Sequence, residues 1–209
     1  YYSALSGAEL FHPDAENELV RFTQKYPESL KAKLAYFHAG KILYKQKKYK
    51  NAVDYFEKTD ISYLDNEEIP EYYFKKGYSY FSIKDYTNAS KSFHEILNVE
   101  SKYKTAANYY YAHVAYQNNN LNTALEGFRK LQDSESFGPI VPYYIVQIYY
   151  EQEKYDEVIK YAKTLESRTD VKNSAEISRF VAESYYKKGQ YEQALKMFED
   201  FERNYPRMS

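Results

Sequence analysis

The chain has 209 residues and a formal net charge of −1, because 29 lysines and arginines stand against 30 aspartates and glutamates. This balance argues against a nucleic-acid-binding domain, which needs a basic excess to neutralise phosphates. The absence of cysteine excludes disulfides, thiol nucleophiles and cysteine-ligated metal sites.

Tyrosine is the unusual feature of the composition. The chain has 28 Tyr and 12 Phe but no Trp, and only six Gly and six Pro, which is too few for an all-β protein rich in tight turns. No stretch approaches the roughly 18 apolar residues that a membrane-spanning helix needs. A helical chain with this many aromatic side chains must place them in a regular pattern.

The first predicted element is a helix between Asp14 and Ser29. Ala15 and Leu19 lie on one face of this segment, and Pro27 closes it. We expect it to be the second helix of a partial repeat spanning residues 1–29, with Tyr1–Leu10 in the helix before it.

Five segments that follow repeat one pattern, and each opens on a small or slim residue. An aromatic residue comes four positions later in every copy, and a second small or slim residue comes twelve positions later. The opening residue recurs every 34 to 37 positions, at Gly40, Gly77, Ala112, Val146 and Ala182. This regularity predicts a repeat protein, in which each unit buries its apolar face only by stacking on its neighbours.

Each repeat is predicted to contain two helices. The first half has apolar residues at helical spacing, as at Tyr36, Ala39 and Leu43, and it ends in a polar turn such as Lys47-Lys48. The second half restarts the period at Ala52. Small residues on facing helices let two backbones approach, and a Phe one turn later fills the space beside them.

The pattern resembles the tetratricopeptide repeat, a helix–turn–helix unit of 34 residues with a small residue, an A-x₃-F motif and a closing Pro. The fourth copy departs from A-x₃-F with Val158 and Ala162. The signature Trp is replaced in every copy, by Tyr36, Tyr73, Asn108, Pro142 and Ser178.

This resemblance implies an all-α, right-handed α-solenoid of stacked antiparallel helix pairs, forming one array over residues 1–209. The expected repeats lie at about residues 33–66, 70–104, 105–138, 139–174 and 175–209. We expect the chain to be a segment of a longer array.

The resemblance also implies that the first helices of successive repeats line a concave groove that binds a protein or peptide segment. The expected groove residues are Phe37, Lys41, Tyr44, Phe74, Tyr78, Phe81, Tyr109, His113, Tyr116, Tyr143, Gln147, Tyr150 and Tyr186. Two interpretations stay open, because these rings can pack against the next helix or grip a partner. No pattern for a catalytic, phosphate-binding or calcium site is present, so we predict a non-enzymatic scaffold with no cofactor and no metal.

Two other functions remain open: a regulatory or targeting arm of a larger enzyme, and self-association through open solenoid ends. The segment Glu18–Phe56 resembles repeats of bacterial envelope proteins of the Tol-Pal and outer-membrane-assembly lipoprotein type. That resemblance predicts a periplasmic or envelope-associated protein, with a cytoplasmic location as the alternative.

Overall fold

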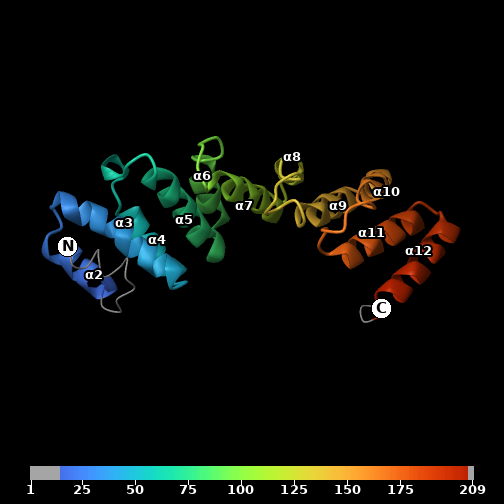
Figure 1. Cartoon of the computed structure of the whole chain (residues 1–209), viewed down its shortest axis with the longest axis horizontal. Helices are drawn as coiled ribbons and strands as arrows, with labels where there is room; N and C mark the ends of the chain where they lie inside the picture. The colour runs from blue at the N-terminus through green and yellow to red at the C-terminus, as the bar shows by residue number, and fades with distance from the viewer. Residues whose placement is uncertain (1–14, 207–209) are drawn as a thin grey trace. The chain divides into compact units, whose positions relative to one another are not determined.

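The computed structural model describes residues 15–206, and the predicted segment Tyr1–Leu10 lies outside them. The described residues form helices and contain no strand (Figure 1). They divide into two compact units, the first ending at Asn118 and the second starting at Asn119. The helices without strands confirm the predicted all-α fold of the described residues, and the single array over residues 1–209 stays a prediction.

The first unit contains α2 to α7. The elements are α2 (Ala15–Lys25), α3 (Leu30–Lys45), α4 (Tyr49–Glu57), the short 3₁₀ helix η1 (Ile61–Tyr63), α5 (Glu68–Ser82), α6 (Tyr86–His94) and α7 (Lys104–Gln117). Helix α3 packs on α4 and α5 packs on α6, and each pair is covered by the first helix of the next repeat. The observed α2 agrees with the helix predicted between Asp14 and Ser29.

The second unit contains α8 to α12. The elements are α8 (Leu121–Arg129), α9 (Val141–Glu151), α10 (Tyr155–Thr164), α11 (Ser174–Lys187) and α12 (Tyr191–Asn204). Helix α9 packs on α8 and α10, while α11 packs on α9, α10 and α12. The helices therefore stack in the order expected of consecutive repeats.

One residue in each turn between paired helices adopts a left-handed backbone. These residues lie seven positions after the opening small residue, with φ between 56° and 74°, and they are Lys47, Lys84, Asn119, Glu153 and Gly189. A left-handed conformation costs a residue with a Cβ atom roughly 1–2 kcal/mol, and only the last copy avoids this cost with glycine. The structure therefore repeats in phase with the sequence even where the sequence itself varies.

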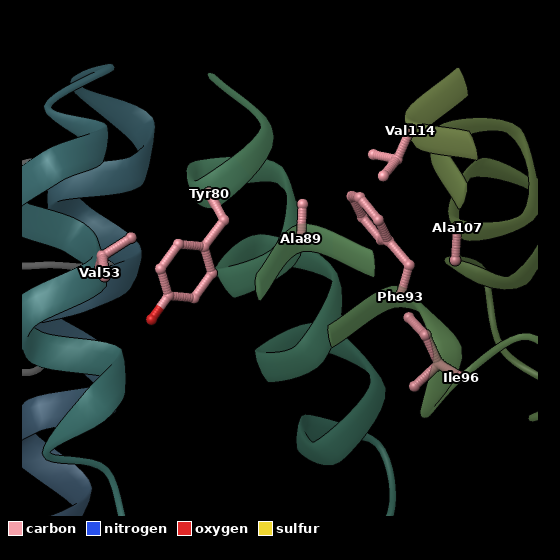
Figure 2. Packing of buried hydrophobic residues seen from close by; sticks show 7 residues of the cluster. All are labelled: Val53, Tyr80, Ala89, Phe93, Ile96, Ala107 and Val114. Carbon is pink, nitrogen blue, oxygen red and sulfur yellow. The ribbon is translucent and has the colours of Figure 1, made fainter. Parts of the chain in front are cut away.

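The two opening glycines, Gly40 and Gly77, are required by close packing. A Cβ atom on Gly40 would lie 2.7 Å from Cε1 of Phe56, and one on Gly77 would lie 2.9 Å from Cε1 of Phe93. Both Phe side chains are fully buried. Figure 2 shows the ring of Phe93 between Ala89 and Val114, within a cluster that includes Ile96. The predicted pairing of a small residue with a Phe on the facing helix is confirmed.

Candidate functional site

Aromatic rings from three successive first helices contact one another in the first unit. The ring centroids of Tyr44 on α3 and Tyr78 on α5 are 5.6 Å apart, and those of Tyr78 and Tyr110 on α7 are 5.0 Å apart. Phe81 lies 5.2 Å from Tyr110 and 5.3 Å from His113. All four contacts are edge-to-face, the geometry that the ring quadrupoles favour. We call Tyr44, Phe74, Tyr78, Phe81, Tyr103, Tyr110 and His113 the aromatic face.

Every member of the aromatic face is half-buried. Phe74 shows why, because its ring stacks on Tyr103 at 5.1 Å while it packs against the buried cluster around Phe93. Each ring therefore contacts its neighbours on one side and leaves part of its surface to solvent. Packing against neighbouring helices, one of the two interpretations left open by the sequence, is observed for these rings, and their gripping of a partner stays a prediction.

Two predicted groove residues of the first unit lie in the core instead. The side chain of Phe37 is fully buried against Phe56 and Tyr72, and that of Tyr109 is 8% exposed. These rings support the aromatic face from beneath and present almost no surface to a partner. Tyr116, near the end of α7, is half-buried and keeps some accessible surface.

A charged cluster borders the aromatic face. The Lys41 Nζ atom lies 3.4 Å from Oε2 of Glu71, and the Lys75 Nζ atom lies 2.5 Å from Oε1 of the same carboxylate. The two ammonium groups also sit over aromatic rings, Lys41 4.7 Å from the centroid of Phe37 and Lys75 5.4 Å from that of Tyr44. The cluster therefore holds two cations and one anion in partly buried positions.

Burial and ion pairing shift the pKa of Glu71 in opposite directions. Burial tends to raise the pKa of Glu71, but hydrogen bonds and charge interactions with Lys75 and Lys41 outweigh it, so the pKa lies below its ordinary value. Burial lowers the pKa of Lys75. Burial and the negative charge of Glu71 raise the pKa of Tyr103 to about 12. Glu71 thus remains ionised, and Tyr103 remains a neutral phenol, at physiological pH.

The two histidines of this region are neutral. Burial, aided by the charge of Lys41, lowers the pKa of His38 to about 4. Burial lowers the pKa of His113. A neutral imidazole on the aromatic face adds a polar atom without adding charge.

The second unit carries a smaller set of the predicted groove residues. Tyr143 and Tyr150 contact Phe180 on α11, with centroid distances of 6.4 Å and 4.9 Å. The Gln147 amide donates to Oε1 of Glu151 at 3.1 Å. Tyr186 is 57% exposed. These residues lie on α9 and α11, the first helices of the last two repeats. The ring contacts with Phe180 link two first helices, whereas those of the aromatic face link three.

Sequence reasoning missed several members of the site. Tyr110 stands two positions before the opening small residue, a position left out of the predicted groove, although it connects α5 to α7. Glu71 was missed because its ion pair with Lys41 joins two helices, α3 and α5. Its pair with Lys75 lies four residues along α5 and was not considered. The recurrence of aromatic residues two positions before the opening residue, at Tyr110, Tyr144 and Phe180, was the available signal.

Across residues 15–206, no group of three or more His, Asp or Glu side chains is placed to hold a metal ion. None of the described helices is long and apolar enough to cross a membrane.

Parts of the amino-acid sequence match family models of the tetratricopeptide repeat. Residues 34–58 and 70–103 match one family model for the tetratricopeptide repeat, and residues 181–207 match another. A search of curated proteins found no match. The comparisons give no support to the envelope-lipoprotein resemblance of Glu18–Phe56, which stays a prediction.

Solved structures with the same fold differ widely in sequence. YrrB, described as a tetratricopeptide-repeat protein with an unusual peptide-binding site, superposes with a TM-score of 0.68 at 15% identity, covering 89% of this chain and 93% of its own. MamA gives a TM-score of 0.66 at 18% identity, covering 82% and 90%. The C-terminal part of a repeat protein from Cytophaga hutchinsonii gives 0.64 at 18% identity, covering 81% and 65%. With the repeated helix pairs, these findings show that the chain has the fold of tetratricopeptide-repeat proteins and that segments of it match models of this repeat.

Proposed function

We propose that the protein is a non-enzymatic scaffold whose aromatic face binds an extended or helical segment of a partner protein. The observation that carries the proposal is the network of half-buried rings running from Tyr44 through Tyr78 to Tyr110. Aromatic side chains held rigidly by their neighbours bury a large area on binding at a low entropic cost. YrrB, which shares the fold, is described as having a peptide-binding site.

The charged cluster suggests what the partner segment contains. Lys41 and Lys75 share one carboxylate, Glu71, so this part of the face carries one net positive charge when His38 is neutral. A segment with apolar side chains for the rings and one acidic side chain near Lys41 would complement both features.

Replacing Phe81 with Ala should weaken partner binding by about 1–3 kcal/mol, because the ring contacts both Tyr110 and His113 at the centre of the face. Calorimetric titration with a partner identified by crosslinking measures this change. Tyr63→Ala is the matched control, because Tyr63 is 37% exposed on η1 and belongs to no part of the face. A folded Phe81→Ala protein that keeps full affinity would exclude the aromatic face as the binding surface.

A second function, self-association, is favoured by the exposure of one edge of the α11–α12 pair. The residue thirteen positions after the opening small residue is 8% exposed at Val53, Leu125 and Ile159, but Leu195 in the same position is 62% exposed. Tyr186 and Tyr191 beside it are 57% and 63% exposed. This edge continues the series of apolar interfaces between repeats, and we propose that a second copy of the chain covers it.

Substitution of Leu195 by Lys should therefore abolish concentration-dependent association, because a charge would be buried in the apolar contact. Sedimentation velocity over a range of protein concentrations measures the effect. Leu30→Lys is the control, since Leu30 is 59% exposed on α3. An unsubstituted protein that stays monomeric at the highest concentration would contradict self-association.

The remaining alternatives stay predictions. A role as the regulatory or targeting arm of a larger enzyme, and a location in the bacterial envelope, have no supporting observation in the structure. The first would be supported by a catalytic domain in the same polypeptide, and the second by recovery of the protein in an envelope fraction.

A further inference from the structure

A cavity of about 670 Å³ lies within the second unit, among α10, α11 and α12. Its apolar lining includes Ile159 and Ala162 on α10, Val181 on α11, and Met197 and Phe201 on α12. We call it the α10–α12 cavity. Its volume is in the range of pockets that bind ligands.

The cavity occurs where the repeat loses a Phe. The residue sixteen positions after the opening small residue is Phe in the first three copies, and each ring contacts an aromatic ring on the next first helix. The pairs are Phe56 with Tyr72 at 5.9 Å, Phe93 with Tyr110 at 5.7 Å, and Phe128 with Tyr144 at 4.8 Å. The fourth copy has Ala162 at this position, and Phe180 on the next first helix contacts Tyr143 and Tyr150 instead.

A second small residue enlarges the same space. The position four before the opening residue holds Tyr73 in the second copy, where its ring packs against the buried cluster that contains Phe56. The last copy has Ser178 at this position, and Ser178 lines the cavity together with Ala162. The chain thus lacks two aromatic side chains on facing helices at one junction, and open space replaces them.

The charges around the opening are largely balanced within the protein. Nη2 of Arg168 lies 2.6 Å from Oδ2 of Asp170 and donates to the carbonyl oxygen of Gly138 at 3.2 Å. Asp200 is paired with Arg203. Of the other lining residues, Lys163 and Glu166 carry opposite formal charges. A rim whose charges compensate one another favours an uncharged occupant over an ionised one.

We propose that the α10–α12 cavity binds an uncharged aromatic side chain presented by a segment of a partner protein. At the first three junctions the ring at the repeat position of Ala162 lies against an aromatic ring of the next first helix. The site lies in the second unit and shares no residue with the aromatic face, so it is a separate binding site whose existence does not depend on the proposed function.

The test uses capped phenylalanine amide as the probe and the whole ¹⁵N- and ¹³C-methyl-labelled chain. We expect saturable shifts of the amide signals of Ser178, Val181 and Tyr185, and nuclear Overhauser effects between the probe ring and the methyl groups of Val181 and Met197. Capped glutamine amide, of similar size but without a ring, should give no saturable shifts. Failure of the aromatic probe to show these contacts, or equal shifts from both probes, would overturn the proposal.

Filling the cavity provides a second readout. The double variant Ala162→Phe with Ser178→Tyr introduces the aromatic residues that the first two repeats have at these positions. It should weaken probe binding at least tenfold while keeping the helical circular dichroism spectrum. Ala162→Leu, a smaller change, should weaken binding to a lesser degree and serves if the double variant does not fold. Unchanged probe affinity in a folded, filled variant would overturn the proposal, whereas the outcome says nothing against binding at the aromatic face.

Discussion

Replacing Phe56 with Ala should lower the free energy of unfolding by about 3–5 kcal/mol. The side chain is fully buried, and its ring contacts Phe37 at 6.5 Å and Tyr72 at 5.9 Å. The ring also fills the space left by Gly40, where a Cβ atom would come within 2.7 Å of Cε1. Because surrounding helices collapse only partly around a deleted ring, the cost includes both lost burial and an unfilled cavity.

Urea denaturation followed by circular dichroism measures the total effect, and hydrogen exchange locates it. Contacts in a repeat protein run mainly between neighbouring repeats, so amides of α3, α4 and α5 should lose protection more than those of α11 and α12. Phe198→Ala is the matched control, because Phe198 holds the same repeat position on α12 but is only half-buried. Equal losses in the two variants would contradict the burial argument.

The parts of the fold that depend on spacing were predictable from the sequence. The sequence predicts the helix pairs, the polar turns and the contact of Gly40 with Phe56 from residues that recur at fixed positions of the repeat. These residues recur because each repeat packs on its neighbours in the same way. The left-handed turn residues Lys47 and Lys84 were not predicted as such, since neither is a residue that favours positive φ. Their conformation is imposed by the helices on either side.

The candidate site was predictable only in outline. Spacing placed Tyr44, Tyr78 and Phe81 on one side of the first helices, and the structure brings them together. Spacing could not distinguish a ring that remains half-exposed from one that is buried, as Phe37 is, because exposure depends on how closely the next helix approaches. The division after Asn118 and the α10–α12 cavity likewise depend on tertiary contacts.

Departures from the repeat pattern mark junctions where the packing between helices changes. A substitution such as Ala162 in a Phe position removes buried area that the other copies use for stability. The loss is confined to one junction, because interactions between distant repeats are weak. A repeat protein can therefore tolerate a cavity at one junction while its neighbours keep the fold, which makes such junctions places where a binding site can form.

Acidification from about pH 7 to about pH 5 should destabilise the protein through His38 by about 1–2 kcal/mol, after allowance for solvent screening of a half-buried group. Burial lowers the pKa of His38 from 6.5 to about 4 in the folded protein. Between these values the unfolded chain binds a proton that the folded chain does not, so stability falls as the pH falls. The contribution is fully present above the unfolded pKa and is lost by about pH 4.

The His38→Gln variant isolates this effect, because glutamine keeps a polar side chain but does not titrate. Urea midpoints at the two pH values, compared between the original and variant proteins, should show a smaller acid-induced loss in the variant. Groups far from His38 that titrate in both proteins cancel in this comparison, whereas Glu71, whose charge acts on His38, does not. An identical loss in the two proteins would mean that the pKa of His38 is the same in the folded and unfolded chains, which would contradict the prediction. Since a protonated His38 would add a second uncompensated positive charge beside Lys41, the same variant should also reduce any acid sensitivity of binding at the aromatic face.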